Sequence, residues 1–412
     1  MPVPVPVRTA ALLALFLPAL PACSQNAEVL ELVETVPVET TLDHADLRDT
    51  YVVWPEMIDG ATKTLDFAEF YASDEPGSRP SRLGTVIQAV ERAAGRGVRV
   101  RFLSDKRFEK TYPDTLARLG RMPGAQVRII DVGALSGGVL HAKYFVVDGR
   151  EMFMGSQNFD WRALEHILEM GVRLAEPDVI RAFQDVFETD WALAAPGADK
   201  TFRAKTSSAG FPGVPARVGS GEDAPAVTPV FSPKGWLPDE KLWDLPHLVE
   251  MIDGARSTVR VQLLTYKTIS RDGSYFDTLE SALRRAAARK VKVQLLLADW
   301  SKSKGNIEGL QSLQSVPGID VRLSTIPQWS GGFIPFARVA HAKYLVVDGK
   351  RSWIGTGNWE GDYFYQSRNA GLVIDSASVG GRLDRFFEDA WGSTYAYDVD
   401  PCKTYEPARV AE

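Results

Sequence analysis

Two copies of a short motif carry residue types suited to phosphoryl chemistry. Each copy has a histidine, a lysine two residues later and an aspartate five residues after that. An imidazole can attack phosphorus or move a proton, and an ammonium group can neutralise a phosphoryl oxygen. The residues are His141, Lys143 and Asp148 in the first copy and His341, Lys343 and Asp348 in the second.

Each motif is followed by Gly-(Ser/Thr)-x-Asn at the same distance. Alternation along a strand predicts that the histidine and the lysine of one motif face the same side. Asp-Gly then predicts a tight hairpin that folds the next strand back, so that the asparagine returns close to the histidine. We expect Asp148, Asp348, Ser156 and Thr356 to be structural residues near the site. The asparagines are Asn158 and Asn358.

One motif alone cannot cleave a phosphodiester, which needs a nucleophile, a proton donor for the leaving oxygen and positive charge on the other oxygens. Two histidines on opposite sides of one phosphate can divide this work. One would attack in line and form a phosphohistidine, and the other would protonate the leaving group and then activate water or an alcohol. The lysines and asparagines would hold the phosphoryl oxygens. No metal-ligand spacing is evident, so we expect neither a metal nor another cofactor.

The elements that must position these residues are themselves duplicated. Residues 56–61 recur as 250–255, and residues 98–103 have a counterpart in 291–296. Helical spacing followed by strand-like runs predicts two homologous α/β/α sandwich units. The expected helices cover residues 83–94, 179–191, 279–286 and 383–391, and the expected strands cover residues 98–103 and 291–297.

The length of 412 residues suits such a pair of units, and 45% hydrophobic with 24% charged residues indicates a folded protein. A net charge of −6 gives no global attraction to nucleic acid or anionic lipid, so an anionic substrate must be gripped locally. We predict a signal peptide over residues 1–22, a first unit over 23–195, a linker or surface excursion over 196–228 and a second unit over 229–412.

The amino-terminus predicts export. Arg8 precedes an apolar run over residues 9–19, which is too short to span a bilayer, and no second apolar stretch approaches the ~20 residues needed. The residues before Cys23 resemble a bacterial lipobox. We therefore expect a protein of the bacterial periplasm, or one anchored to the membrane by a lipid on Cys23. The alternative is a disulfide between Cys23 and Cys402, the only two cysteines.

The paired motifs resemble the signatures of the phospholipase D superfamily. Longer stretches resemble its branch of eukaryotic lysosomal single-strand exonucleases and poxvirus envelope relatives. These stretches are residues 32–37, 138–141, 158–162, 334–339 and 355–359. The resemblance covers nearly the whole mature chain. It implies a bilobal monomer with a pseudo-two-fold axis, an active site at the interface of the units and a phosphohistidine intermediate.

The resemblance also assigns roles residue by residue. His141 and His341 match the catalytic histidines, and Lys143, Lys343, Asn158 and Asn358 match the phosphate-holding positions. Glu169 matches a carboxylate that orients the histidine, whereas the second half has Asn369 at the equivalent position. Family precedent makes His141 the nucleophile and His341 the acid.

Three functions remain open from the sequence. The first is hydrolysis of phosphodiesters in single-stranded DNA or RNA, and the alternative is a phospholipase D or transphosphatidylase acting on phospholipid head groups. The third is a catalytically silent envelope protein that holds anionic lipid in the cleft. Trp161, Trp359 and Tyr363 follow the motifs, where aromatic rings either pack in the core or contact bases or lipid chains.

Overall fold

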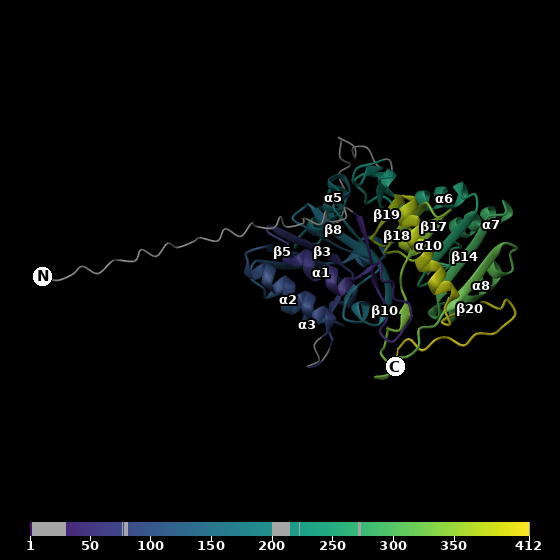
Figure 1. Ribbon diagram of the computed structural model, residues 1–412, viewed down its shortest axis with the longest axis horizontal. Coiled ribbons are helices and arrows are strands. Elements are labelled where there is room, and N and C mark those ends of the chain that lie inside the picture. The colour runs from purple at the N-terminus through teal and green to yellow at the C-terminus, as the bar shows by residue number, and fades with distance from the viewer. Residues whose placement is uncertain are drawn as a thin grey trace.

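The computed structural model describes residues 30–75, 77, 81–199, 215–221, 223–270 and 273–411, together with residue 1. The predicted signal peptide, the lipidation site Cys23 and part of the predicted linker lie outside these residues. Two units of mixed α/β structure lie side by side, the first in purple to teal and the second in green to yellow (Figure 1). The predicted fold of two homologous α/β units is confirmed.

The first unit is built on a mixed sheet in the order β2-β1-β10-β8-β7-β3-β5-β6, with β4 and β9 paired separately. The strands are β1 Leu30–Thr35, β2 Arg48–Asp49, β3 Thr64–Glu69, β4 Ala72–Ser73, β5 Arg99–Asp105, β6 Ala125–Ile130, β7 Lys143–Val147, β8 Glu151–Gly155, β9 Phe159–Asp160 and β10 Ile167–Leu174. The helices are α1 Thr50–Asp59, α2 Arg82–Gly95, α3 Pro113–Gly120, α4 Val132–Ser136 and α5 Pro177–Leu193.

The second unit repeats this plan in the order β11-β12-β19-β18-β17-β13-β14-β15-β20. The strands are β11 Ala216–Arg217, β12 Ala226–Ser232, β13 Thr258–Leu263, β14 Lys292–Ala298, β15 Ile319–Ser324, β16 Val339–Ala340, β17 Tyr344–Val347, β18 Arg351–Gly355, β19 Asn369–Asp375 and β20 Ala396–Asp398. The helices are α6 Asp244–Gly254, α7 Thr278–Ala288, α8 Ile307–Gln314, α9 Gly361–Tyr365 and α10 Ala377–Gly392.

Local sequence explains the regular parts of each unit. In α2, the hydroxyl of Ser81 accepts a hydrogen bond from the amide of Gly84 and caps the helix. Leu83 and Val90 belong to the buried stripe of this helix, and Gly97 follows the helix at φ +89°, a conformation that favours glycine. The next strand, β5, then pairs in parallel with β3.

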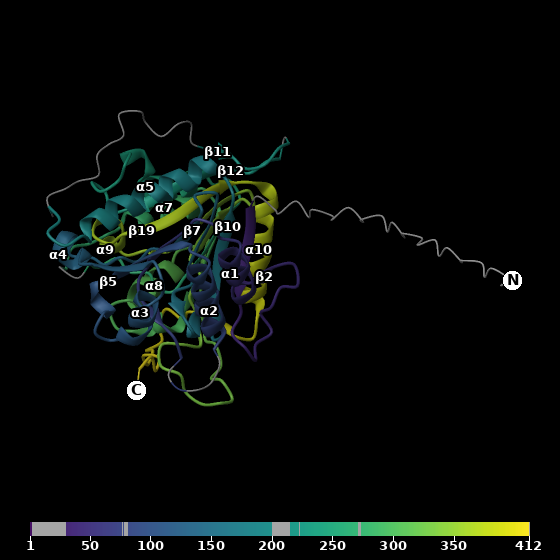
Figure 2. The ribbon, with the colours of Figure 1, turned by 90° about the vertical axis from the view of Figure 1, so that its left-hand side faces the viewer.

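The helices divide between outer and inner faces. Side chains of α1, α2 and α3 form one core cluster on the outer face of the first sheet, and those of α6, α7 and α8 form another on the second. Side chains of α5 and α10 belong to a third cluster, which contains strand residues from both units. Figure 2 shows α5 above the strands β7 and β19, and α10 to the right of β10. The apolar contact between the units is therefore continuous with their own cores.

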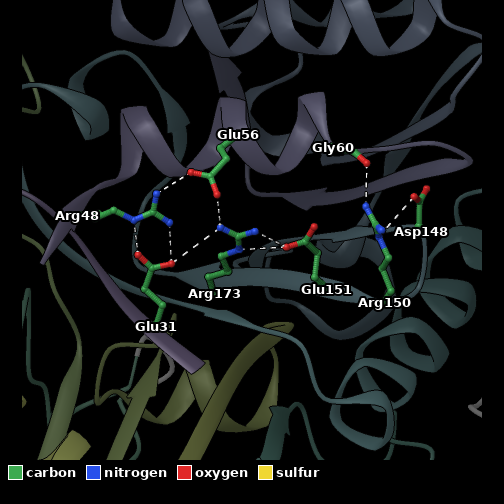
Figure 3. Close-up of polar contacts among 8 residues, drawn as sticks. All are labelled: Glu31, Arg48, Glu56, Gly60, Asp148, Arg150, Glu151 and Arg173. Atoms are coloured by element: carbon green, nitrogen blue, oxygen red, sulfur yellow. Dashed lines mark hydrogen bonds and ion pairs between the residues drawn. The ribbon is translucent and has the colours of Figure 1, made fainter. Parts of the chain in front are cut away.

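Polar contacts hold the strands around β10 in register. Arg48 of β2 contacts Glu31 of β1 and Glu56 of α1 at 2.5 and 2.6 Å, as drawn in Figure 3. Arg173 of β10 contacts the same Glu56 at 2.7 Å and Glu151 of β8 at 2.8 Å. Each partly exposed pair contributes about 0–1 kcal/mol. The network spans the end of β10 opposite to the one that carries Glu169.

Two observations bear on the termini. Cys402 is exposed and has no disulfide partner among the described residues, and Cys23, the other cysteine, lies outside them. In the part of the chain that the structure describes, no helix is long and apolar enough to cross a membrane.

Candidate active site

The hairpin after each motif forms at Asp-Gly. Asp148 and Gly149 have φ of +53° and +64°, and the equivalent pair at 348 and 349 has +54° and +64°. Positive φ at both central positions is the geometry of a type I′ turn. The turn joins β7 to β8, and its repeat joins β17 to β18.

Both motif aspartates lie at this turn and bind backbone amides. The carboxylate of Asp148 accepts hydrogen bonds from the amides of Thr62, Lys63 and Thr64 at 2.7–2.9 Å. Burial opposes ionisation, but these bonds outweigh it and lower the pKa of Asp148 to about 2. Asp348 accepts the amides at positions 256–258 in the same way. Each aspartate ties its hairpin to the neighbouring strand.

The two motif histidines precede their strands, which corrects the expectation that they lie within them. Strand β7 begins at Lys143, and β17 begins one residue after Lys343. The amide of His141 instead donates to the carbonyl of Arg368 in the second unit at 2.8 Å. The amide of His341 donates to Leu168 in the first unit, also at 2.8 Å. Each histidine segment thus leaves its own sheet to bond with the other unit, which brings both histidines to the interface.

The two lysines are buried beneath the histidines. The ammonium of Lys143 donates to the carbonyl of His141 at 2.7 Å, and that of Lys343 donates to the carbonyl of His341 at 2.5 Å. Each ammonium group thus lies against the backbone of its histidine, and the lining of the cavity contains the histidines but not the lysines. Each lysine also fixes the backbone of the histidine that it accompanies.

One cavity of about 230 Å³ contains both histidines and both asparagines in its lining. The remaining lining is largely aromatic, and it includes Phe70, Tyr112, Trp300, Phe336 and Tyr363. The side-chain oxygen of Asn158 is buried and has no hydrogen-bond partner among the described residues. This oxygen is therefore free to accept a hydrogen bond from a ligand.

His341 is oriented by the carboxylate of the other repeat. Nδ1 of His341 lies 2.8 and 3.0 Å from the two oxygens of Glu169, and the side chain of Glu169 is fully buried. Glu169 lies on β10. This strand pairs with β8, which ends just before Ser156, and with β16, which ends just before His341. A carboxylate at Nδ1 stabilises the protonated ring and points Nε2–H away from the carboxylate.

His141 has an amide partner instead, Asn369 of the other repeat. The side-chain nitrogen of Asn369 donates to the carbonyl of Tyr363 at 2.9 Å, so its oxygen must face His141. This oxygen accepts from the hydroxyl of Thr356 at 3.1 Å and lies 3.2 Å from Nδ1 of His141. Nδ1 of His141 must therefore carry the proton, because the oxygen cannot donate. The neutral ring then leaves the lone pair of Nε2 free.

Ionisation in the site is governed by burial. Burial raises the pKa of Glu169 to about 8 and lowers that of Lys143 to about 7. Burial and the nearby lysine charges also hold the pKa of both histidines well below the usual range. An anionic substrate between these groups would offset the repulsion among the cations. Its binding therefore favours the charged forms of the lysines and of the His341–Glu169 pair.

Among the residues that the structure describes, no group of three or more His, Cys, Asp or Glu side chains could hold a metal ion. The cationic groups at the site are the ammonium groups of Lys143 and Lys343 and the guanidinium of Arg162. Arg162 contacts Asp160 in a fork and lines the cavity.

Sequence reasoning missed several residues around the site. Glu69 of β3 is buried opposite Lys143 in the strand register, and burial raises its pKa. Phe70, which the sequence did not single out, packs edge-on against the ring of His141 with a centroid distance of 5.0 Å, and Tyr363, which it did, packs there at 4.9 Å. The position equivalent to Glu69 in the second repeat is Leu263, so comparison of the repeats gives no signal for it.

Arg368 also supports the site from the second unit. Its buried guanidinium contacts Asp190 of α5 at 2.8 and 2.9 Å, and its carbonyl is the acceptor for His141. Of the aromatic residues that follow the motifs, Tyr363 lines the cavity, Trp359 is fully buried and Trp161 lies in an adjoining pocket.

A duplicated α/β fold that brings two motif histidines to one cavity, each with a buried lysine bonded to its carbonyl, defines a phosphodiesterase of the phospholipase D type. A family model described as "Cardiolipin synthase, PLD-like domain" matches residues 55–191 and 248–391. The chain belongs to this family of phospholipase D-like proteins.

Similar proteins of known name lie in the exonuclease and poxvirus branch. The "Virion nicking-joining enzyme" of Vaccinia virus (strain Western Reserve) is 32% identical over 385 residues, covering 89% of each chain. The "5'-3' exonuclease PLD3" of Homo sapiens is 30% identical over 408 residues, covering 90% of this chain and 80% of its own. The predicted membership of this branch is confirmed.

Solved structures with little sequence identity share the fold. Phosphatidylserine synthase from Haemophilus influenzae Rd KW20 has a TM-score of 0.63 at 11% identity, covering 90% of this chain and 87% of its own. Polyphosphate kinase from Porphyromonas gingivalis has a TM-score of 0.55 at 13% identity, covering 92% of this chain and 51% of its own. At such identities the likeness extends to the fold alone.

Proposed function

We propose that this phosphodiesterase hydrolyses single-stranded nucleic acid through a covalent intermediate on His141, with His341 as general acid and base. The observation that carries the proposal is the difference between the two histidine partners. Asn369 favours a neutral ring at His141, which suits a nucleophile, and Glu169 favours a proton on His341, which suits an acid.

In the first step, Nε2 of His141 attacks phosphorus and a P–N bond forms. The bond from phosphorus to the leaving oxygen breaks, and that oxygen takes the proton from Nε2 of His341. Lys143, Lys343 and the two asparagines hold the non-bridging oxygens as negative charge spreads over them.

In the second step, water attacks phosphorus and His341 takes its proton. The P–N bond breaks and its electron pair returns to Nε2 of His141. The product is a phosphomonoester, and both histidines regain their starting protonation. Because the lysine ammonium groups supply the positive charge, we expect activity to persist in excess EDTA.

The nucleic-acid substrate is supported by the names of the relatives at 30–32% identity and by the aromatic lining of the cavity. The test compares a 5′-labelled single-stranded oligonucleotide with vesicles of phosphatidylcholine and phosphatidylglycerol, both with EDTA present. We expect nucleotide release, and its loss in His141→Ala and His341→Ala. His247→Ala is the control, because His247 binds the carbonyl of Lys241 outside the cavity. Head-group release without nucleotide release would establish the lipid alternative.

We also propose that the protein is exported and carries a lipid on Cys23. The proposal rests on the apolar run and the lipobox-like residues of the amino-terminus. Mass spectrometry of the mature amino-terminus tests it. A diacylglyceryl group on Cys23 is expected, and a free or disulfide-bonded Cys23 would contradict it.

A further inference from the structure

The cavity is also lined by one residue of a loop that lies outside the two histidine–lysine motifs. The loop runs over residues 327–338, immediately before β16 and His341. Phe336 at its tip lines the cavity together with both histidines. Its side chain is 48% exposed, which is unusual for a large apolar residue beside a buried site.

The backbone of this loop is held in a conformation that its residues do not favour. Phe336 has φ +57° and Arg338 has φ +54°, both in the left-handed region. A bulky residue persists there only where surrounding contacts hold it, and such residues cluster at functional sites. The contacts that hold Phe336 therefore decide where its ring lies.

The contact to the backbone of Phe336 comes from the carboxyl-terminal segment, residues 406–411. The amide of Phe336 donates to the carbonyl of Val410 at 2.8 Å. One residue earlier in the segment, the guanidinium of Arg409 lies over the ring of Phe333, 3.8 Å from its centroid. The segment thus touches the loop at two points.

The chain is also fixed just before this segment begins. The amide of Val399 donates to Val321 of β15 at 2.9 Å, and the side chain of Gln311 donates to the carbonyls of Asp400 and Lys403. The stretch from Val399 to Val410 therefore connects the edge of the second sheet to the loop. Contacts from the other unit hold the far side of the loop, where Arg338 donates to Val38 at 2.8 Å.

The free face of the Phe336 ring suits a flat ligand. Phe70, Tyr71, Phe108 and Tyr112, which also line the cavity, pack on one another. In the described part of the chain, the ring of Phe336 makes no contact with another ring. Its face is available to a planar group that accompanies the phosphate.

We propose that Phe336 stacks on the nucleobase beside the scissile phosphate, and that the carboxyl-terminal segment positions Phe336 for this role through Val410 and Arg409. The proposal deepens the proposed function and rests on it. Stacking would select single-stranded substrate, because the base must leave its neighbours to lie on the ring.

The test measures kcat/KM for an oligonucleotide and for the same oligonucleotide with an abasic site at the residue being released. A stacked base contributes about 5- to 150-fold in binding, so wild type should prefer the intact substrate by a factor in this range. Phe336→Ala should remove the preference, and Phe336→Tyr should restore it because the ring is kept. A merely structural role of Phe336 would lower both rates and leave their ratio unchanged.

The positioning role of the carboxyl-terminal segment is tested by two variants. One is a chain that ends at Tyr405, and the other is Arg409→Ala. Both should reduce the base preference, and Arg409→Ala does so without shortening the chain. Lys234→Ala is the matched control, because Lys234 lies over the ring of Trp243, away from both the loop and the carboxyl-terminal segment. If Phe336→Ala keeps the preference for the intact over the abasic substrate, the stacking role is overturned. If the truncated chain and Arg409→Ala both keep it, the positioning role is overturned. Absence of any oligonucleotide cleavage by wild type would instead refute the proposed function.

Discussion

The carboxylate of Glu169 lies 2.8 Å from Nδ1 of His341, although the two residues belong to different repeats. The equivalent contact on the other side joins Asn369 to His141 at 3.2 Å. Each unit therefore supplies the partner of the other unit's histidine. The exchange makes the two histidines unequal, because one partner is a carboxylate and the other an amide.

Glu169→Gln should remove most of the activity. Glutamine keeps the size of the side chain but cannot stabilise a protonated His341, so general acid catalysis is lost. General acid–base catalysis contributes roughly 10²- to 10⁴-fold, and kcat should fall by a factor in this range. Glu151→Gln, in the surface network, should leave kcat unchanged. Equal kcat in Glu169→Gln and wild type would exclude the role of this pair.

Activity should fall as the pH rises. Burial raises the pKa of Glu169 to about 8, so its pair with His341 holds a proton below that pH and loses it above. Lys143, whose pKa burial lowers to about 7, loses its charge in the same direction. A profile of kcat/KM against pH should decline through about pH 7–8. A profile that rises through this range would be inconsistent with an acid made by this pair.

Asn369→Asp should convert the partner of His141 into a carboxylate. A carboxylate at Nδ1 favours the protonated ring, so the pKa of His141 should rise. The nucleophile is then neutral only at higher pH, so the acidic limb of the kcat/KM profile should shift to higher pH. Asn306→Asp, on a helix cap away from the cavity, serves as the control. An acidic limb unmoved by Asn369→Asp would contradict the assignment of His141 as nucleophile.

Lys143→Met should stabilise the fold while it abolishes activity. The folded state holds the pKa of Lys143 at about 7, below its ordinary 10.5, so the folded state disfavours the charge. Between pH 7 and 10.5 the unfolded chain holds this proton more often than the native state does. The contribution of Lys143 to stability is therefore most favourable above pH 10.5, and it falls as the pH falls toward 7. At pH 7 the substitution should raise the free energy of unfolding by about a few kcal/mol. The gain should shrink as the pH approaches 10, measured by denaturant unfolding.

Asp190→Ala should weaken both the fold and the site. It leaves the guanidinium of Arg368 buried and unpaired, which costs about 3–5 kcal/mol, and it loosens the segment that accepts the amide of His141. Asp59→Ala breaks an exposed pair with Arg92 and should cost about 1 kcal/mol or less. Chemical denaturation of both variants checks the difference. Equal losses would show that the ion pair does not hold the interface.

Much of the architecture follows from local sequence. The helix periods, the Asp-Gly turns and the repeated motifs predict two α/β units and a shared site, because these signals depend on residues close together in the chain. Contacts between the units depend on how the two units pack, and the spacing of residue types along the sequence does not predict that packing. Three contacts are of this second kind. The amide of His141 bonds to Arg368, and Glu69 is buried beside Lys143. Glu169 and Asn369 each contact the histidine of the other repeat.

The central claim is that His141 forms the covalent intermediate while His341 moves the protons. The direct test uses His341→Ala with bis(p-nitrophenyl) phosphate, whose nitrophenolate departs without an acid. The first step should then proceed and the second should stall for want of a base. We predict a burst of about one equivalent of nitrophenolate and a nitrophenylphosphoryl group on His141, found by mass spectrometry after an alkaline quench. An adduct on His341 in His141→Ala, with none on His141 in His341→Ala, would contradict the claim.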